Sequence, residues 1–182
     1  MNKKKILAVL FILIVLFIGY MVSQKNSIDE VVADSLDVLK ASYQIIHKDQ
    51  IGDKTIVISI VEEKDLNFMI IQEDLYKYES IYSGYMGGFE QVMDTFGLLY
   101  VELPKQVMDG QLFCFGLLND DSIANLTIAD ESRSVDGLVS ETTEFTYWRA
   151  NVSDIKSRSI IINGFNSEGD QLLEAEELLR EN

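Results

Sequence analysis

The sequence predicts an α+β protein: an N-terminal transmembrane helix, then an amphipathic helix with a three-stranded antiparallel meander, then a mostly antiparallel β-sandwich-like half. Three observations predict it. An unbroken apolar run follows three lysines, and a helical apolar stripe precedes three β-branched and aromatic segments. After Gly97, short strand-like segments recur at intervals of roughly 8–12 residues, which is typical of a β-sandwich. We therefore divide the chain into residues 1–26, 27–97 and 98–182.

The first part is predicted to be a membrane anchor. The 17 apolar residues Ile6–Val22 rise about 25 Å as a helix, close to the ~30 Å hydrocarbon core of a bilayer. Lys3, Lys4 and Lys5 precede this run, so the positive-inside rule places the N-terminus in the cytoplasm. We expect a single-pass plasma-membrane protein with an extracytoplasmic C-terminal part. The alternative is a cleaved secretory signal, although no Ala-x-Ala site follows the run.

The charge of the chain is very uneven. The net charge is −15, and the 157 residues after Lys25 carry 11 basic and 30 acidic side chains. Such a surface repels phosphate, so nucleic acid and anionic lipid heads are poor partners for this part of the chain. The partners that remain are the membrane, through Ile6–Val22, and another membrane or cell-surface protein.

The second part is predicted to begin with a helix. Ser27 and Glu30 have the spacing of a capping box, in which each side chain satisfies the other's backbone N–H. Apolar residues then recur at helical spacing up to Ile46, so we expect the helix to end near His47.

Three strands are predicted to follow the helix as a meander. They are Thr55–Val61, Phe68–Gln72 and Tyr76–Tyr82, the last with Tyr76, Tyr78, Ser80 and Tyr82 on one face. Phe89–Phe96 is long enough for two helical turns.

The third part is predicted to hold short strands separated by Gly, Pro, Asn and Asp turns. The predicted strands are Leu98–Leu103, Gln111–Leu118, Asn125–Ile128, Gly137–Ser140, Glu144–Ala150 and Ser159–Phe165. The tail Gln171–Arg180 is predicted to pair with the last of these as a strand that frays or turns helical after Glu174.

The lysine-led anchor, the helix with its meander and the final IIINGFNSEGDQLLE hairpin together resemble small uncharacterised membrane-anchored outer-surface proteins of Gram-positive bacteria. The resemblance implies an anchored, extracytoplasmic protein and carries over no functional residue.

Catalytic and metal-binding patterns are sparse. The single histidine, His47, and the single cysteine, Cys114, cannot supply a zinc site, and no nucleophile motif or phosphate-binding loop is present. We expect His47 to be a helix-terminal cation, and Cys114 and Trp148 to be core residues. The cluster Asn119-Asp120-Asp121, with Asp130 and Glu131 across a strand pair, is the nearest approach to a calcium site, and turn chemistry explains it as well. The prediction is therefore no catalytic residue, no metal and no cofactor.

The remaining feature is a cluster of aromatic side chains. Rings that give a large contact area at low entropic cost are typical of binding surfaces, so we expect a ligand or partner surface at Tyr76, Tyr78, Tyr82, Tyr85 and Phe89. Core packing under the helix is the competing interpretation. The predicted function is a non-catalytic binding or interaction module. The alternatives are a carboxylate-based hydrolase of cell-wall or polysaccharide material, and self-association through the helix Ser27–His47.

Overall fold

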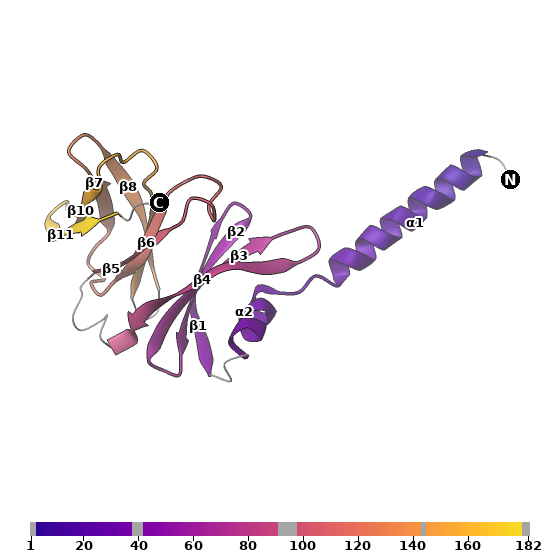
Figure 1. The fold of residues 1–182 in the computed structure, drawn as a ribbon, viewed down its shortest axis with the longest axis horizontal. Coiled ribbons are helices and arrows are strands. Elements are labelled where there is room, and N and C mark those ends of the chain that lie inside the picture. Colours follow the sequence, from indigo (N-terminus) through magenta and orange to yellow (C-terminus); the bar gives the residue numbers. More distant parts are fainter. Residues whose placement is uncertain (1–2, 38–41, 91–97, 143–144, 180–182) are drawn as a thin grey trace.

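The computed structural model of the chain describes all residues except 1–2, 38–41, 91–97, 143–144 and 180–182. It is an α+β protein with two N-terminal helices and two antiparallel sheets (Figure 1). The helices are α1 (Lys3–Ser23) and α2 (Ile28–Asp37). The first sheet has four strands in chain order: β1 (Tyr43–Ile51), β2 (Lys54–Val61), β3 (Asp65–Glu73) and β4 (Tyr78–Gly88).

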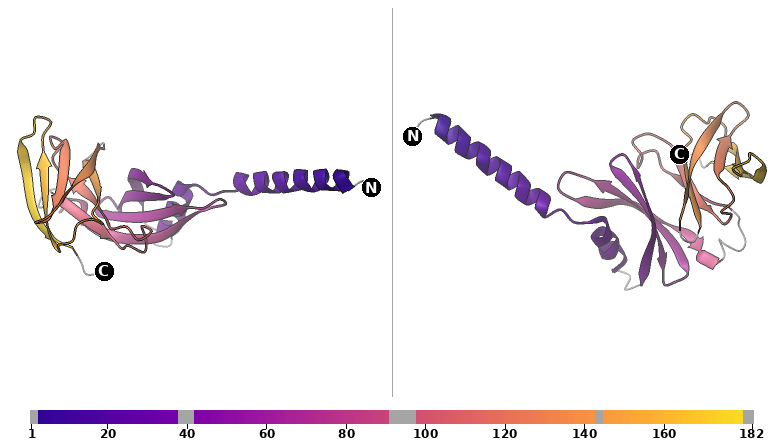
Figure 2. Two further views of the ribbon diagram at one scale, coloured as in Figure 1. Left: turned by 90° about the horizontal axis from the view of Figure 1, so that it is seen from above. Right: turned by 180° about the vertical axis from the view of Figure 1, so that it is seen from behind.

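The second sheet has seven strands in the order β11-β10-β7-β8-β9-β6-β5. They are β5 (Leu98–Leu103), β6 (Phe113–Leu118), β7 (Asn125–Ala129), β8 (Ser134–Glu141), β9 (Thr146–Asn151), β10 (Ser159–Phe165) and β11 (Gln171–Leu178). Side chains of β6 and β9 share one core cluster with side chains of β7 and β10, because the sheet curls around them (Figure 2). The prediction of a β-sandwich-like half is therefore corrected to one curled sheet.

Strand β2 is buried on both faces because it lies between helix α2 and the second sheet. Ile56, Ile58 and Ile60 point into a cluster that also contains Phe115 and Tyr147 of the second sheet. The alternate residues of β2 point the other way, toward α2. The layers are thus α2, the four-stranded sheet, and the β5–β6–β9 part of the seven-stranded sheet.

Helix α2 confirms the predicted helix start and corrects its end. The backbone N–H of Ser27 donates to Glu30 at 2.7 Å and that of Glu30 donates to the Ser27 hydroxyl at 3.2 Å, which is the predicted capping box. Val32 is fully buried against the first sheet. The helix ends at Asp37, and residues from Tyr43 onward form β1 rather than a continuation of the helix.

Helix α1 projects away from the body of the protein (Figures 1 and 2). Large apolar side chains along it are exposed, with Leu7, Phe11 and Leu16 each more than 60% accessible. Taken alone, no helix in the described part of the chain meets the length and hydropathy expected of a membrane span. Leu10–Ser23 and Ile28–Leu36, bent by 50° at the break, meet them as a pair, as a signal sequence near an N-terminus also does.

The segment between the two helices is fixed to the first sheet. The ammonium of Lys25 pairs with Glu73 at 2.7 Å and lies 4.3 Å from the ring centroid of Tyr78. The Asn26 side chain donates to the backbone C=O of Tyr78 at 3.0 Å and accepts from its N–H at 2.7 Å. The C-terminal end of helix α1 is therefore held at a defined point beside the β3–β4 hairpin.

Several predicted elements fall differently in the structure. The meander has a fourth strand, β1, and β11 remains a strand to Leu178 instead of turning helical after Glu174. Most of Phe89–Phe96 lies outside the described residues. The boundary at residues 97 and 98 stays a prediction, although the two sheets share one core.

Candidate functional site

A groove runs between the edge strands of the two sheets. Its volume is about 270 Å³. Its lining comes from β3 and β4 on one side and from β5 on the other, and consists of Phe68, Tyr82, Gly84, Tyr85, Met86, Tyr100, Val101 and Glu102. Among the described strands, β4 and β5 are each the outermost strand of their sheet, so the groove lies where the two sheet edges meet.

Two of the predicted binding residues, Tyr82 and Tyr85, line this groove. Tyr85 is 63% exposed and Tyr82 is 36% exposed. The Tyr82 ring packs 5.8 Å from the ring of Phe68, so one side of it rests on the core. Tyr85 is more exposed, and among the described residues its hydroxyl donates a long hydrogen bond, 3.4 Å, to Asp65.

The tyrosines do not form the single stripe that alternation predicted. In the pairing of β3 with β4, Ile70 lies opposite Tyr82 and Ile71 lies opposite Ser80. Ile81 is therefore the extra residue of a β-bulge. Tyr78 therefore lies on the α2 face with the third core cluster, whereas Tyr82 lies on the opposite face beside Phe68. Tyr85 lies three residues farther along β4, so regular alternation places it on the α2 side, where it also lines a neighbouring hollow of about 290 Å³; the second shift comes after it, at Met86.

The other three predicted residues lie away from the groove. Tyr76 is exposed in the turn between β3 and β4. Tyr78 is the residue that Lys25 and Asn26 hold, so its role is to fix the start of β4. Phe89 packs against the main core and lines a different hollow, with Tyr43 of β1.

Gly84 brings β4 close to the floor of the groove. A Cβ atom at this position would lie 2.5 Å from Cε1 of the Phe68 ring. That ring packs edge-on against Phe115 of the second sheet, with 5.2 Å between centroids. Only glycine leaves room for the ring there. Through this ring, the strand that lines the groove packs directly on the core between the two sheets.

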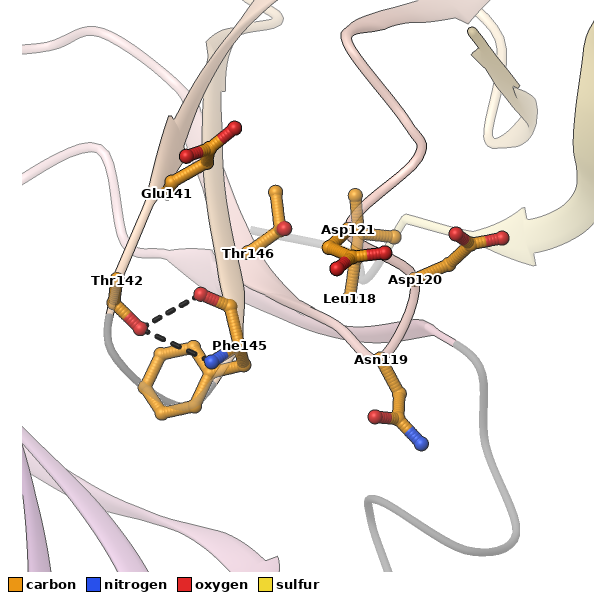
Figure 3. A pocket seen from close by; sticks show the side chains of 8 residues that line it. All are labelled: Leu118, Asn119, Asp120, Asp121, Glu141, Thr142, Phe145 and Thr146. Atoms are coloured by element: carbon orange, nitrogen blue, oxygen red, sulfur yellow. Dashed lines mark hydrogen bonds between the residues drawn. The ribbon is translucent and has the colours of Figure 1, made fainter.

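A larger and more polar cavity, about 440 Å³, lies at the end of β6, β8 and β9 (Figure 3). Its lining includes Asp120, Asp121 and Glu141. The Asp120 carboxylate already accepts the N–H and the hydroxyl of Ser122, at 2.9 and 2.5 Å. On the other wall, the Thr142 hydroxyl bonds to the backbone of Phe145 (Figure 3).

The residues considered for calcium do not meet in one place. Asp130 and Glu131 are not part of the polar cavity. Asp130 instead accepts backbone N–H groups from Ser132, Lys156 and Ser157, and these hydrogen bonds hold its pKa far below the usual range. Within the described ranges, no three His, Cys, Asp or Glu side chains are placed to hold a metal ion.

A polar network joins β1 to β9, which the sequence analysis did not anticipate. Asp49 accepts a hydrogen bond from the Tyr147 hydroxyl at 2.9 Å and forms an ion pair with Arg149, with 2.7 Å between Oδ2 and Nε. That N–H is not directed at the oxygen, so the contact is ionic rather than a good hydrogen bond. His47 stacks on Tyr147 with 4.1 Å between ring centroids.

The environment sets the protonation of this network. Burial lowers the pKa of His47, and nearby Asp49 opposes that effect. Burial and the Asp49 charge raise the pKa of Tyr147. His47 lies within strand β1 and its pKa is lowered by burial, which corrects the expected helix-terminal cation. The network joins β1 of the first sheet to β9 of the second, so it contributes to the contact between the sheets.

Cys114 and Trp148 are core residues, as expected. Both are fully buried, and burial raises the pKa of the Cys114 thiol to about 12. The indole N–H of Trp148 has no acceptor among the described residues. Cys114 is therefore protonated and inaccessible to reagents at neutral pH.

No family model, no curated protein and no solved structure matches this chain. The residues and their geometry are therefore the basis of the proposals that follow.

Proposed function

We propose that this chain is a single-pass, membrane-anchored extracytoplasmic protein that acts as a non-catalytic binding module. The observation that carries the proposal is the groove between β4 and β5, the outermost strands of the two described sheets, where Tyr82 and Tyr85 are exposed. Partner segments that add to a sheet edge gain backbone hydrogen bonds, and neighbouring pockets give the specificity.

The anchor is supported by the surface of α1. Large exposed apolar side chains lie along the helix, among them Leu7, Phe11, Leu16 and Tyr20, and an apolar surface of this extent is unfavourable in water. Helix α2 places its apolar residues on the first sheet instead, so α1 is the part of the bent pair that is free to enter a bilayer.

The charge of the body favours one kind of partner. The acidic excess after Lys25 favours a protein segment that carries basic residues, because opposite potentials speed and orient association. Apolar or aromatic residues in that segment would pack on Phe68, Tyr82 and Tyr85 at the groove.

The acids support binding rather than carboxylate chemistry. A glycosidase general acid needs a raised pKa, usually from burial. Among the described carboxyl groups whose pKa is displaced, Asp53, Glu73 and Asp130 are all displaced downward by hydrogen bonds, the largest from Lys54, Lys25 and the Ser157 backbone respectively.

The test is crosslinking from intact membranes with the full-length chain as bait and mass spectrometry as the readout. A photoreactive residue at Tyr85 should give one reproducible protein adduct, and a photoreactive residue at exposed Leu138 of β8 should not. Tyr82→Ala and Tyr85→Ala should each lower capture about tenfold or more if these rings are central to the interface.

A clean negative result, with the bait shown to be folded and outside the cell, would contradict the binding module. Capture that is unchanged in both tyrosine variants would contradict the groove as its site. The first result would justify a screen of glycans and of polysaccharide hydrolysis.

A further inference from the structure

The tip of the β3–β4 hairpin exposes two large apolar side chains. The turn closes with a hydrogen bond from the N–H of Asp74 to the C=O of Lys77 at 2.8 Å, and the Asp74 carboxylate accepts the N–H of Leu75 at 2.6 Å. Leu75 is 58% exposed and Tyr76 is 41% exposed. A tight turn between two strands does not require apolar residues at these positions, since polar residues are usual there.

The position of this tip is fixed relative to α1. Glu73 and Tyr78, which flank the turn, are the residues that bind Lys25 and Asn26 just after the helix ends. In each view the tip lies beside the last turn of α1, on the side from which the helix projects (Figures 1 and 2). A bilayer that holds α1 would therefore have its surface at the level of Leu75 and Tyr76.

We propose that Leu75 and Tyr76 form a second membrane contact, in the interfacial layer of the bilayer that holds α1. This inference rests on the proposed membrane anchor. Tyrosine is enriched at this depth because its ring is apolar and its hydroxyl reaches water, and leucine next to it can enter the acyl boundary.

The charges around the tip permit this contact. Lys25 neutralises Glu73, and Lys77 pairs with Glu79 at 2.6 Å. Asp74 is engaged in the turn. The acidic body repels anionic lipid, so the contact depends on apolar insertion and is expected with zwitterionic lipid.

Two points of attachment orient the domain. Strand β4 runs from the tip, so Tyr82 and Tyr85 lie farther along it, away from the helix (Figure 1). The two contacts would then hold the groove at a fixed height above the membrane, facing outward.

The test uses the full-length chain in phosphatidylcholine nanodiscs, with a polarity-sensitive fluorophore on Leu75→Cys. Cys114 is buried, so the wild-type chain serves as the unlabelled control. Leu138→Cys, at a similarly exposed leucine of β8, is the matched site on the body. Phe11→Cys, on exposed α1, reports insertion of the anchor itself.

We expect blue-shifted emission and quenching by lipids that carry a shallow nitroxide for Leu75→Cys, and by lipids with a deep nitroxide for Phe11→Cys. Leu138→Cys should show neither effect. If Phe11→Cys is quenched and Leu75→Cys behaves like Leu138→Cys, the anchor stands and the interfacial contact is wrong. If Phe11→Cys is not quenched, the proposed anchor fails, and the contact that rests on it fails too.

Discussion

At Gly84, the addition of a single methyl group is expected to lower the stability of the fold. A methyl group there meets the Phe68 ring at 2.5 Å, and that ring is itself held by Phe115. We expect Gly84→Ala to lower the free energy of unfolding by about 1–3 kcal/mol, because the ring must shift within a packed core. Urea unfolding of the full chain in detergent measures this loss.

The control for this prediction is a double-mutant cycle. Phe68→Leu removes the ring that the new methyl group would meet, so Gly84→Ala should cost much less in that background. Equal costs in the two backgrounds would mean that the loss comes from the backbone and not from the ring.

His47 should make the stability of the protein depend on pH. Burial lowers its pKa in the folded state, so the unfolded chain binds a proton more readily. The free energy of unfolding should therefore be highest above the unfolded value of about 6.5 and should fall as pH decreases through it. His47→Phe keeps a ring against Tyr147 and removes the titrating group.

Urea unfolding between about pH 7.5 and 5.5 measures this effect, because carboxyl groups with ordinary pKa values stay ionised over most of that window. The wild-type chain should lose stability toward pH 5.5, and His47→Phe should not. The chain has no other histidine, so an equal slope in both proteins would contradict the assignment to His47.

Among the elements, those with a plain sequence pattern were predicted well. The bounds predicted for Leu98–Leu103 and Ser159–Phe165 are those of β5 and β10, because both are apolar segments between clear turn residues. The helix start at Ser27 was also correct, since a capping box depends only on local spacing.

Strand β1 was missed for a physical reason. Ile46 is the extra residue of a bulge, between Ile45 and His47 in the pairing with β2. The extra residue interrupts the alternation of inward and outward side chains that marks a strand. Without that alternation, the spacing of Tyr43 and Ile46 fitted the apolar stripe of a helix. The bulge of β4 at Ile81 separated Tyr78 from Tyr82 in the same way, so Tyr78 faces α2 whereas Tyr82 lines the groove.

The two faces of β1 give a matched pair of substitutions. Asp49 faces the second sheet, where it holds Arg149 and Tyr147 with only 14% of its side chain exposed. We expect Asp49→Asn to cost about 2–3 kcal/mol, because it leaves a half-buried guanidinium without its counter-charge. Chemical denaturation of the full chain measures the cost.

Asp29→Asn is the control: Asp29 belongs to helix α2, which lies on the other side of β1. Asp29 pairs with Lys48 at the surface, at 2.7 Å and with 66% of the Asp29 side chain exposed. Its loss should change the free energy of unfolding by less than about 1 kcal/mol. Similar effects of the two substitutions would mean that the Asp49 network adds little to the contact between the sheets.

At the scale of the whole molecule, a curled sheet replaces the predicted sandwich. Short strands at even spacing do not reveal whether they lie in two sheets or in one that bends back on itself. The core shows the difference, since the faces of β6 point into two clusters, one shared with the four-stranded sheet and one inside the curl. Long-range pairing of this kind has no local signal in the sequence.

The shared core predicts that both sheets unfold together. Phe115 of β6 is fully buried and contacts Phe68 of β3, so separating the sheets would expose both rings to water. We expect Trp148 fluorescence, which reports the curl, and hydrogen exchange of β2 amides, which reports the first sheet, to give the same free energy of unfolding. Phe115→Ala should lower both values equally, by about 3–5 kcal/mol. A second sheet that loses stability while the β2 amides keep their protection would instead establish two independent domains divided near residue 97.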